Sequence, residues 1–188
     1  MLLQGIKNYG GSFVTKAALW TMIYTGVRTI EIRRSAPSDF DLEAGIWTIP
    51  PTAVKQLRGR VRRAGDDVDD YIVPMPTQLI EKMSELLKVT GKCEFAFPGR
   101  NDPSIMMSEN TLNTAIKRIG LAGKLTGHGV RGTISTALYE FGHIESHVEP
   151  QLSHASPNKS RASYDHASFV EERRVMMQGW ADYLDSLM

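Results

Sequence analysis

Two short runs of β-forming residues, each ended by a proline, limit what this chain can fold into. Ile46–Ile49 is followed by Pro50, and residues 71–73 are followed by Pro74. Proline donates no hydrogen bond to a sheet, so neither run extends further. We expect two short antiparallel strands, joined by the long charged loop between them. A sheet of this size leaves most of the chain to helices.

Helical periodicity fills most of the remaining sequence. Expected helices cover residues 13–24, 28–32, 77–88, 108–119, 131–141, 144–152 and 169–187. The last helix carries an apolar stripe that is typical of a core face, with a neighbouring subunit as the alternative partner. The stripe consists of Phe169, Met176, Met177, Trp180, Leu184 and Leu187. The predicted fold class is α+β, mostly α-helical with a small antiparallel β-sheet.

The composition is that of one ordinary globular domain. The 188 residues are 41% hydrophobic and 23% charged, which suffices for a buried core, and no repeat divides them. No run has the apolar length that a bilayer requires, and the N-terminus lacks the pattern of a signal peptide. The single cysteine, Cys93, fits a reducing compartment. We therefore expect a cytoplasmic protein with no membrane partner.

Charge is distributed unevenly along the loop between the two expected strands. The net charge of +1 does not by itself indicate a nucleic-acid partner. The loop nevertheless opens with a basic group, Lys55, Arg58, Arg60, Arg62 and Arg63, and continues with an acidic one, Asp66, Asp67, Asp69 and Asp70. Such a run is either a self-compensating solvated loop or a basic finger that faces phosphate. Composition leaves both interpretations open.

Several basic side chains and one tyrosine occur in an order that is informative only as a set. Arg28 follows the glycine of Thr25-Gly26-Val27, where the backbone can approach a ligand closely. His128 and Arg131 are three residues apart and would share one face of a helix. His154 and Tyr164 bracket the polar stretch ASPNKSRAS. Taken singly, each of these is an ordinary surface feature.

Together these residues resemble the tyrosine recombinases of the phage integrase family, in the form found in prophages and genomic islands. The family's site is read in the order Arg, Lys, His-x-x-Arg, His and Tyr. Its segments are similar here to TGVRTIEIRRSAPSDFDLEAGIWTIP, LTGHGVRGTISTAL and LSHASPNKSRASYDHASFVEERRVMMQGWADYL. The resemblance covers nearly the whole chain and implies the family's catalytic-domain fold.

The resemblance also implies an activity, namely site-specific cleavage and rejoining of DNA through a 3′-phosphotyrosine, with no metal, ATP or other cofactor. It makes Tyr164 the nucleophile, His128 the base and Lys55 the acid for the leaving 5′-oxygen. Stabilisation of the phosphate falls to Arg28, Arg131 and His154, and further DNA contacts to Arg58, Arg60, Arg62 and Arg161. Glu31 would either orient Arg28 or cap a turn.

The partners implied are double-stranded attachment sites, a homotetramer formed on DNA from monomers, and accessory DNA-bending proteins. Residues 1–188 are expected to form a single catalytic domain without the family's N-terminal core-binding and arm-binding domains. One departure from the family pattern is that Val73 and Pro74 follow Lys55 by some eighteen residues, so the hairpin tip is enlarged. The position of Lys55 just beyond Pro50 still favours it over other lysines.

Three alternatives belong to other functional classes. A protein of this fold could bind DNA without cutting it, although Arg28, Arg131 and Tyr164 are all present. A type IB topoisomerase shares the chemistry but relaxes supercoils. A metal enzyme is the weakest alternative, because His143 and His147 have zinc-compatible spacing but lack the glutamate that the metalloprotease signature places after the first histidine.

Overall fold

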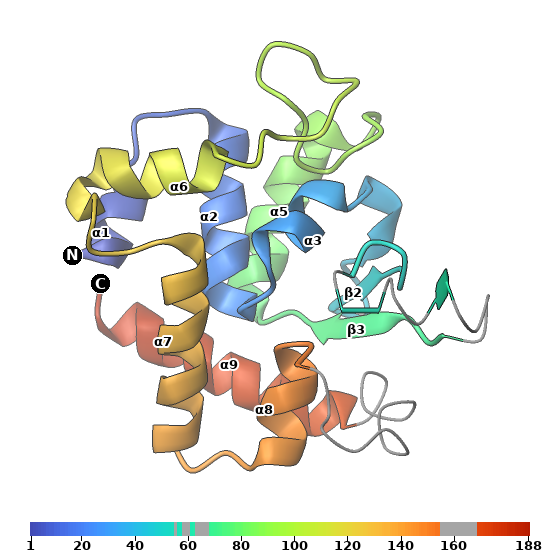
Figure 1. Ribbon diagram of the computed structural model, residues 1–188, viewed down its shortest axis with the longest axis vertical. Coiled ribbons are helices and arrows are strands. Elements are labelled where there is room, and N and C mark those ends of the chain that lie inside the picture. Colours follow the sequence, from blue (N-terminus) through green and yellow to red (C-terminus); the bar gives the residue numbers. More distant parts are fainter. Residues whose placement is uncertain (55, 58–60, 63–67, 155–168) are drawn as a thin grey trace.

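The computed structural model describes residues 1–54, 56–57, 61–62, 68–154 and 169–188 (Figure 1). The longer helices are α2 (Phe13–Thr25), α5 (Thr77–Thr90), α7 (Gly127–Glu140) and α9 (Val170–Ser186). Shorter helical elements are α1 (Leu2–Lys7), α3 (Thr29–Arg34), η1 (Pro37–Asp39), α6 (Thr111–Ile116), η2 (Lys117–Leu121) and α8 (Glu145–Gln151). The strands are β1 (Phe40–Asp41), β2 (Ile46–Ile49) and β3 (Tyr71–Pro74). This confirms the predicted mostly helical α+β fold.

Helix α2 is the centre of the domain. The side chain of Ser12 caps its N-terminus by accepting a hydrogen bond from the backbone N–H of Thr15. Every residue from Ala17 to its C-terminus is buried, because α1, α3, α5, α6, α7 and α9 all pack against it. The indole N–H of Trp180 on α9 donates to the carbonyl of Ile23 at 2.8 Å. The sequence periodicity predicted this helix correctly.

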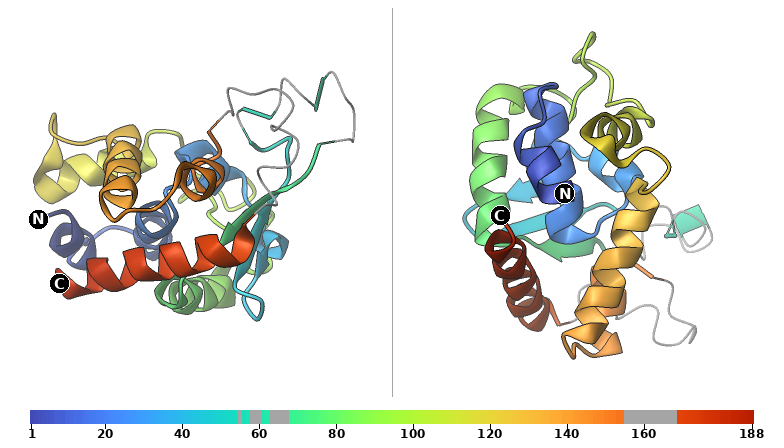
Figure 2. Two further views of the ribbon diagram at one scale, coloured as in Figure 1. Left: turned by 90° about the horizontal axis from the view of Figure 1, so that it is seen from below. Right: turned by 90° about the vertical axis from the view of Figure 1, so that its left-hand side faces the viewer.

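The three strands form an antiparallel sheet in the order β1-β2-β3. Trp47 is paired with Phe40 on one side and with Val73 on the other, and its ring stacks on that of Phe40 at 5.0 Å. The expected antiparallel pair is therefore confirmed. Strand β1 was not predicted because two residues carry too little alternation to be recognised. Helix α9 packs against β3 (Figure 2).

Several helix boundaries differ from the predicted ones. Helix α7 begins at Gly127 rather than at 131, because Thr126 caps it by accepting from the N–H of Gly129. Helix α6 begins at Thr111 rather than at 108, and it passes into the π-type turn η2, which is kinked at Gly120 with φ of 85°. Helix α1 was not predicted at all.

The apolar stripe of α9 is core over its central part. Met176, Met177, Trp180 and Leu184 are buried, whereas Phe169 and Leu187 are 45% and 55% exposed. The stripe was therefore predicted too long at both ends. The two chain ends lie side by side, and the side chain of Gln4 donates to the carbonyl of Met188 at 2.9 Å (Figures 1 and 2). Among the described residues, no helix is both long and apolar enough to cross a membrane.

Candidate active site

The turn at Gly26 organises the candidate site. Gly26 ends α2 with φ of 67°, in the left-handed region that favours glycine. A Cβ at this position would lie 2.7 Å from Cδ2 of Leu152, so the close approach of α8's C-terminus also requires glycine. The carbonyl of Gly26 accepts a hydrogen bond from Nη1 of Arg131 at 2.7 Å. All three family-like segments thus meet at this turn.

Arg28 is held in place by Glu31. The buried Glu31 carboxylate accepts from the backbone N–H of Arg28 at 3.0 Å and from its Nη1 at 3.4 Å. The Arg28 guanidinium also donates to the carbonyl of Ser153 from both Nη1 and Nη2, each at 3.2 Å. Glu31 therefore does both things that were considered for it, capping the start of α3 and orienting Arg28.

Arg131 is almost completely buried, at 5% exposure, on the inner face of α7. Burial and the nearby charge of Arg28 lower its pKa to about 10, against the opposing effects of Tyr71, Glu31 and Glu149. Its Nη2 atom has no hydrogen-bond partner within the described part of the chain. A buried, charged donor that lacks a hydrogen-bond partner costs free energy, unless a ligand supplies the missing acceptor.

His128 occupies the first turn of α7, three residues before Arg131, as the spacing predicted. Its side chain is exposed, unlike that of Arg131. The N-terminus of α7 is fixed by Thr126 and by Asn113, whose side-chain oxygen accepts from the N–H of Gly127 at 2.9 Å. His128 therefore faces solvent at a well-anchored helix end.

His154 follows α8 and is about one-third exposed. Its Nδ1 atom is 2.8 Å from Oε2 of Glu149, and its backbone N–H donates to the carbonyl of Glu149 at 3.0 Å. The pKa of His154 lies below its ordinary value, because burial and the charges of Arg131 and Arg28 lower it more than Glu149 raises it. Ser153, just before it, has φ of 48°, an uncommon value for a residue with a side chain.

Three buried residues that sequence reasoning did not identify connect this region to β3. The hydroxyl of Tyr71 donates to the backbone carbonyl of Gln151, and the side chain of Gln151 donates to the carbonyl of Thr25 at 3.0 Å. On the other side, Nη1 of the buried Arg173 on α9 donates to the carbonyl of Ile72 at 2.9 Å. No local motif reveals these contacts, because each joins residues far apart in the sequence.

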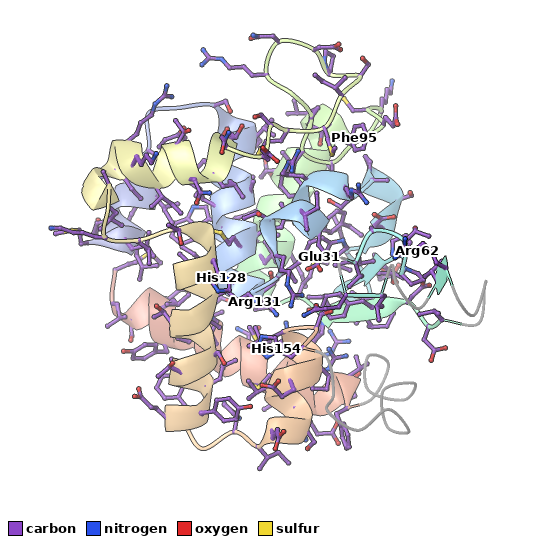
Figure 3. All side chains as sticks on the ribbon, in the orientation of Figure 1. Glu31, Arg62, Phe95, His128, Arg131 and His154 are labelled. Atoms are coloured by element: carbon purple, nitrogen blue, oxygen red, sulfur yellow. The ribbon has the colours of Figure 1, made fainter. Side chains whose placement is uncertain are left out.

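Part of the predicted site lies outside the described residues. That applies to Lys55, Arg58, Arg60, Arg161 and Tyr164. Arg62 is described and exposed, and Figure 3 shows it apart from Arg131 and His154, beyond the sheet. Figure 3 shows Glu31, His128, Arg131 and His154 gathered between α3, α7 and α8. The structure thus brings together Arg28, Arg131 and His154, and His128 lies on the same helix as Arg131.

The electrostatics of this group suit an oxyanion. Two guanidinium groups and an imidazole lie close enough for their charges to act on one another. Guanidinium groups donate paired hydrogen bonds to phosphate and stay protonated at neutral pH. Among the described residues, no group of three or more His, Cys, Asp or Glu could hold a metal ion.

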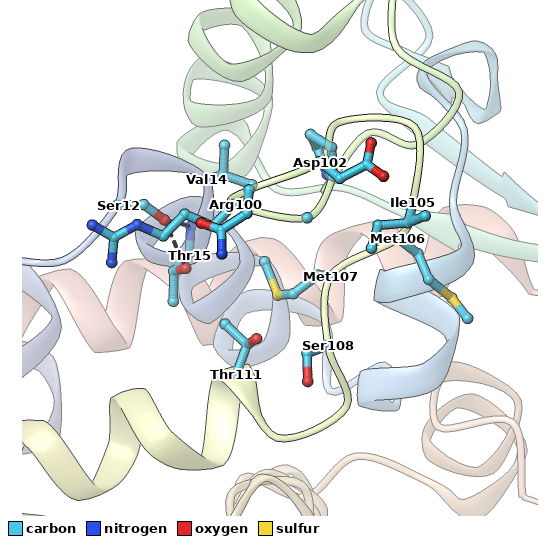
Figure 4. A pocket seen from close by; sticks show the side chains of 13 residues that line it. Ser12, Val14, Thr15, Arg100, Asp102, Ile105, Met106, Met107, Ser108 and Thr111 are labelled. Atoms are coloured by element: carbon cyan, nitrogen blue, oxygen red, sulfur yellow. Dashed lines mark hydrogen bonds between the residues drawn. The ribbon is translucent and has the colours of Figure 1, made fainter.

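A separate hollow of about 450 Å³ lies between the start of α2 and the loop over residues 98–108 (Figure 4). Ser12, Thr15, Met107 and Thr111 are among its lining residues. The described site residues Arg28, His128, Arg131 and His154 are not part of this lining. The candidate site is thus distinct from this pocket.

Comparison with solved structures identifies the fold. An integrase from mycobacterium phage Brujita superimposes with a TM-score of 0.66 at 18% identity, covering 94% of this chain and 55% of that one. The Tn1549 transposon integrase, solved in complex with circular intermediate DNA, gives a TM-score of 0.61 at 18% identity, covering 93% and 61%. The domain therefore has the catalytic-domain fold of the tyrosine recombinases.

Sequence comparison identifies the family. The model of the phage integrase family matches residues 2–171. The integrase of Enterobacteria phage P4 is 37% identical over 189 residues, covering 97% of this chain and 43% of that protein. The chain belongs to the phage integrase family, which confirms the resemblance drawn from its motifs. It spans less than half the length of the curated relatives it matches.

Proposed function

We propose that this chain is the catalytic domain of a site-specific DNA recombinase that integrates or excises a mobile element. The observation that carries the proposal is the convergence of Arg28 and Arg131 on the Gly26 turn, beside His154. The two guanidinium groups would bind the non-bridging oxygens of a scissile phosphate, and the free Nη2 of Arg131 supplies a donor for them. Preorganised donors of this kind stabilise the charge of a pentacovalent transition state.

The chemical steps follow from the family resemblance. The hydroxyl oxygen of Tyr164 attacks phosphorus, the bond to the 5′-oxygen breaks, and a 3′-phosphotyrosine forms. His128 takes the phenolic proton, and Lys55 gives a proton to the departing 5′-oxygen. In the second half, a 5′-hydroxyl of the partner strand attacks the phosphotyrosine and Tyr164 regains its proton. The covalent intermediate conserves the bond, so rejoining needs no nucleotide hydrolysis.

The proposed substrate is double-stranded DNA at attachment sites. The Tn1549 integrase was solved on DNA, and the present domain has the same fold. Arg58, Arg60, Arg62 and Arg161 are proposed to contact the phosphate backbone, which would make affinity dependent on salt. Assembly of four copies on two sites, from monomers and with DNA-bending proteins, is the arrangement that strand exchange between two duplexes suggests.

A suicide substrate tests the proposal. A nicked DNA site, shown to react with a full-length relative, is incubated with the chain in the presence of a chelator. The expected result is a covalent protein–DNA adduct on a denaturing gel, which is lost in Tyr164→Phe while DNA affinity is kept. No adduct from the parent chain would contradict the proposal and favour a protein that only binds DNA. Relaxation of supercoils without strand exchange would favour the topoisomerase alternative.

A further inference from the structure

Glu149 joins His154 to helix α7. One carboxylate oxygen, Oε2, lies 2.8 Å from Nδ1 of His154, and the other, Oε1, accepts from the hydroxyl of Tyr139 at 2.7 Å. Both carboxylate oxygens therefore have a partner: Oε2 contacts His154 in the candidate site, and Oε1 contacts Tyr139 on the helix that carries Arg131. The backbone N–H of His154 also donates to the carbonyl of Glu149, so the two residues are fixed to each other twice.

We propose that Glu149 is a positioning residue that orients His154 and favours its imidazolium form, in which Nδ1–H is donated to the carboxylate and Nε2–H is left to donate to the phosphate. The inference rests on the proposed function. A neutral imidazole carries one N–H. If that proton were on Nδ1, Nε2 could not donate to a phosphate oxygen, and if it were on Nε2, Nδ1 could not donate to Glu149. Both contacts are made together only by the protonated ring.

The surrounding charges show why the carboxylate is needed. Burial lowers the pKa of His154, and Arg131 on α7 and Arg28 beside the Gly26 turn lower it further. Glu149 on α8 opposes these effects in part, through its charge and its hydrogen bond, and the pKa stays below its ordinary value. Without the carboxylate, His154 would lose its proton at lower pH, next to the two guanidinium groups. Tyr139 keeps the carboxylate in position and its own pKa is raised, so its hydroxyl remains a donor.

The expected pH dependence has a defined sign. A donor that acts only when protonated contributes below its pKa and is lost as pH rises through that pKa. Replacing Glu149 by Gln keeps an oxygen that can accept from Nδ1–H but removes the negative charge. The alkaline limb of the cleavage profile should therefore move to lower pH in Glu149→Gln. Glu149→Ala removes both effects and should slow cleavage on the order of tenfold, less than the roughly 100- to 1000-fold expected for His154→Ala.

The experiment measures adduct formation by the full chain on the nicked substrate across a pH series. The variants are Glu149→Gln, Glu149→Ala, Tyr139→Phe and, as a charge-matched control on the same helix, the exposed Glu145→Gln. We expect the alkaline limb to shift in the Glu149 variants, less in Tyr139→Phe, and not in Glu145→Gln. An active parent chain whose Glu149→Gln profile coincides with its own would overturn the inference, whereas an inactive parent chain would overturn the proposed function.

A second readout does not depend on activity. Nitrogen-15 shifts of the His154 ring report which nitrogen carries a proton and at what pH it is lost. In the parent chain, both ring nitrogens should be protonated to a higher pH than in Glu149→Gln. Equal titration of His154 in the two proteins would overturn the inference whatever the kinetics show. Circular dichroism of each variant separates these effects from loss of fold.

Discussion

The hydroxyl of Tyr71 donates a hydrogen bond to the backbone carbonyl of Gln151, which ties strand β3 to the end of helix α8. Burial raises the pKa of Tyr71, and the charge of Glu31 adds to this, so the hydroxyl stays protonated and able to donate. Arg173 binds the carbonyl of the next strand residue, Ile72. The strand thus anchors the chain on both sides of residues 155–168.

Tyr71→Phe should destabilise the fold by about 1–3 kcal/mol, because it leaves the buried carbonyl of Gln151 without its donor. Urea unfolding measures the change in free energy. The same substitution at the exposed Tyr183, on the surface of α9, should alter stability by less than about 0.5 kcal/mol. Equal stability of the two variants would show that the hydroxyl of Tyr71 contributes nothing.

Gly26→Ala should cost about 2 kcal/mol or more. The residue has φ of 67°, and its new methyl group would lie 2.7 Å from Cδ2 of Leu152. The carbonyl that receives Arg131 would shift with it, so adduct formation should also slow. Thermal unfolding provides the stability measurement.

The matched control is Gly179→Ala, within α9. A Cβ there has nothing within 4 Å, and an interior helical glycine costs roughly 0.5–1 kcal/mol relative to alanine. That variant should therefore be stabilised. A Gly26→Ala protein as stable as the parent would mean that the turn tolerates a side chain.

Glu31→Ala should destabilise the domain by roughly 3 kcal/mol, since it leaves the guanidinium and backbone N–H of Arg28 without the buried carboxylate. Chemical denaturation measures the loss, and the suicide substrate should show slower cleavage at unchanged protein concentration. Glu171→Ala removes the exposed partner of Arg174 and should change stability by no more than about 0.5 kcal/mol. Comparable losses in the two variants would contradict the role assigned to Glu31.

Arg131→Met should separate stability from activity. Burial lowers the pKa of Arg131 to about 10, which reflects the cost of keeping its charge inside the domain. An apolar side chain of similar length avoids that cost but leaves the carbonyl of Gly26 without its donor, so the two effects offset and the free energy of unfolding should change by no more than about 1 kcal/mol. Cleavage should fall roughly 100- to 1000-fold while DNA affinity, measured by fluorescence anisotropy, changes little. A marked loss of stability would show that Arg131 is mainly structural.

The sequence predicted those helices and strands whose positions depend mainly on neighbouring residues along the chain. The central helix and the β2–β3 pair follow from periodicity and from prolines that end strands. The start of α7 was predicted too late, because the glycines at 127 and 129 have low helix propensity and the cap supplied by Thr126 compensates for it. The kink inside η2 depends on the left-handed Gly120, whose conformation the sequence does not reveal.

The site was only partly predictable for a similar reason. Family order placed Arg28, Arg131 and His154, and the structure brings them together. Tyr71 and Gln151, which support them, are eighty residues apart and carry no shared motif. Glu149 did carry a signal, since a carboxylate lies five residues before His154 at the end of an expected helix.

Gln151 and Arg173 are both hydrogen-bonded to β3, at Tyr71 and Ile72, and this affects the rate of the proposed reaction. Residues 155–168, which include the proposed nucleophile, connect two points that are fixed to adjacent residues of a single strand. The entropy of bringing those points together is lost once, when the domain folds, rather than at each encounter with DNA. Under the proposed function Tyr164 is the nucleophile, and β3 fixes the described residues on either side of the segment that carries it. Weakening either anchor should slow adduct formation without altering any group that is proposed to touch the substrate.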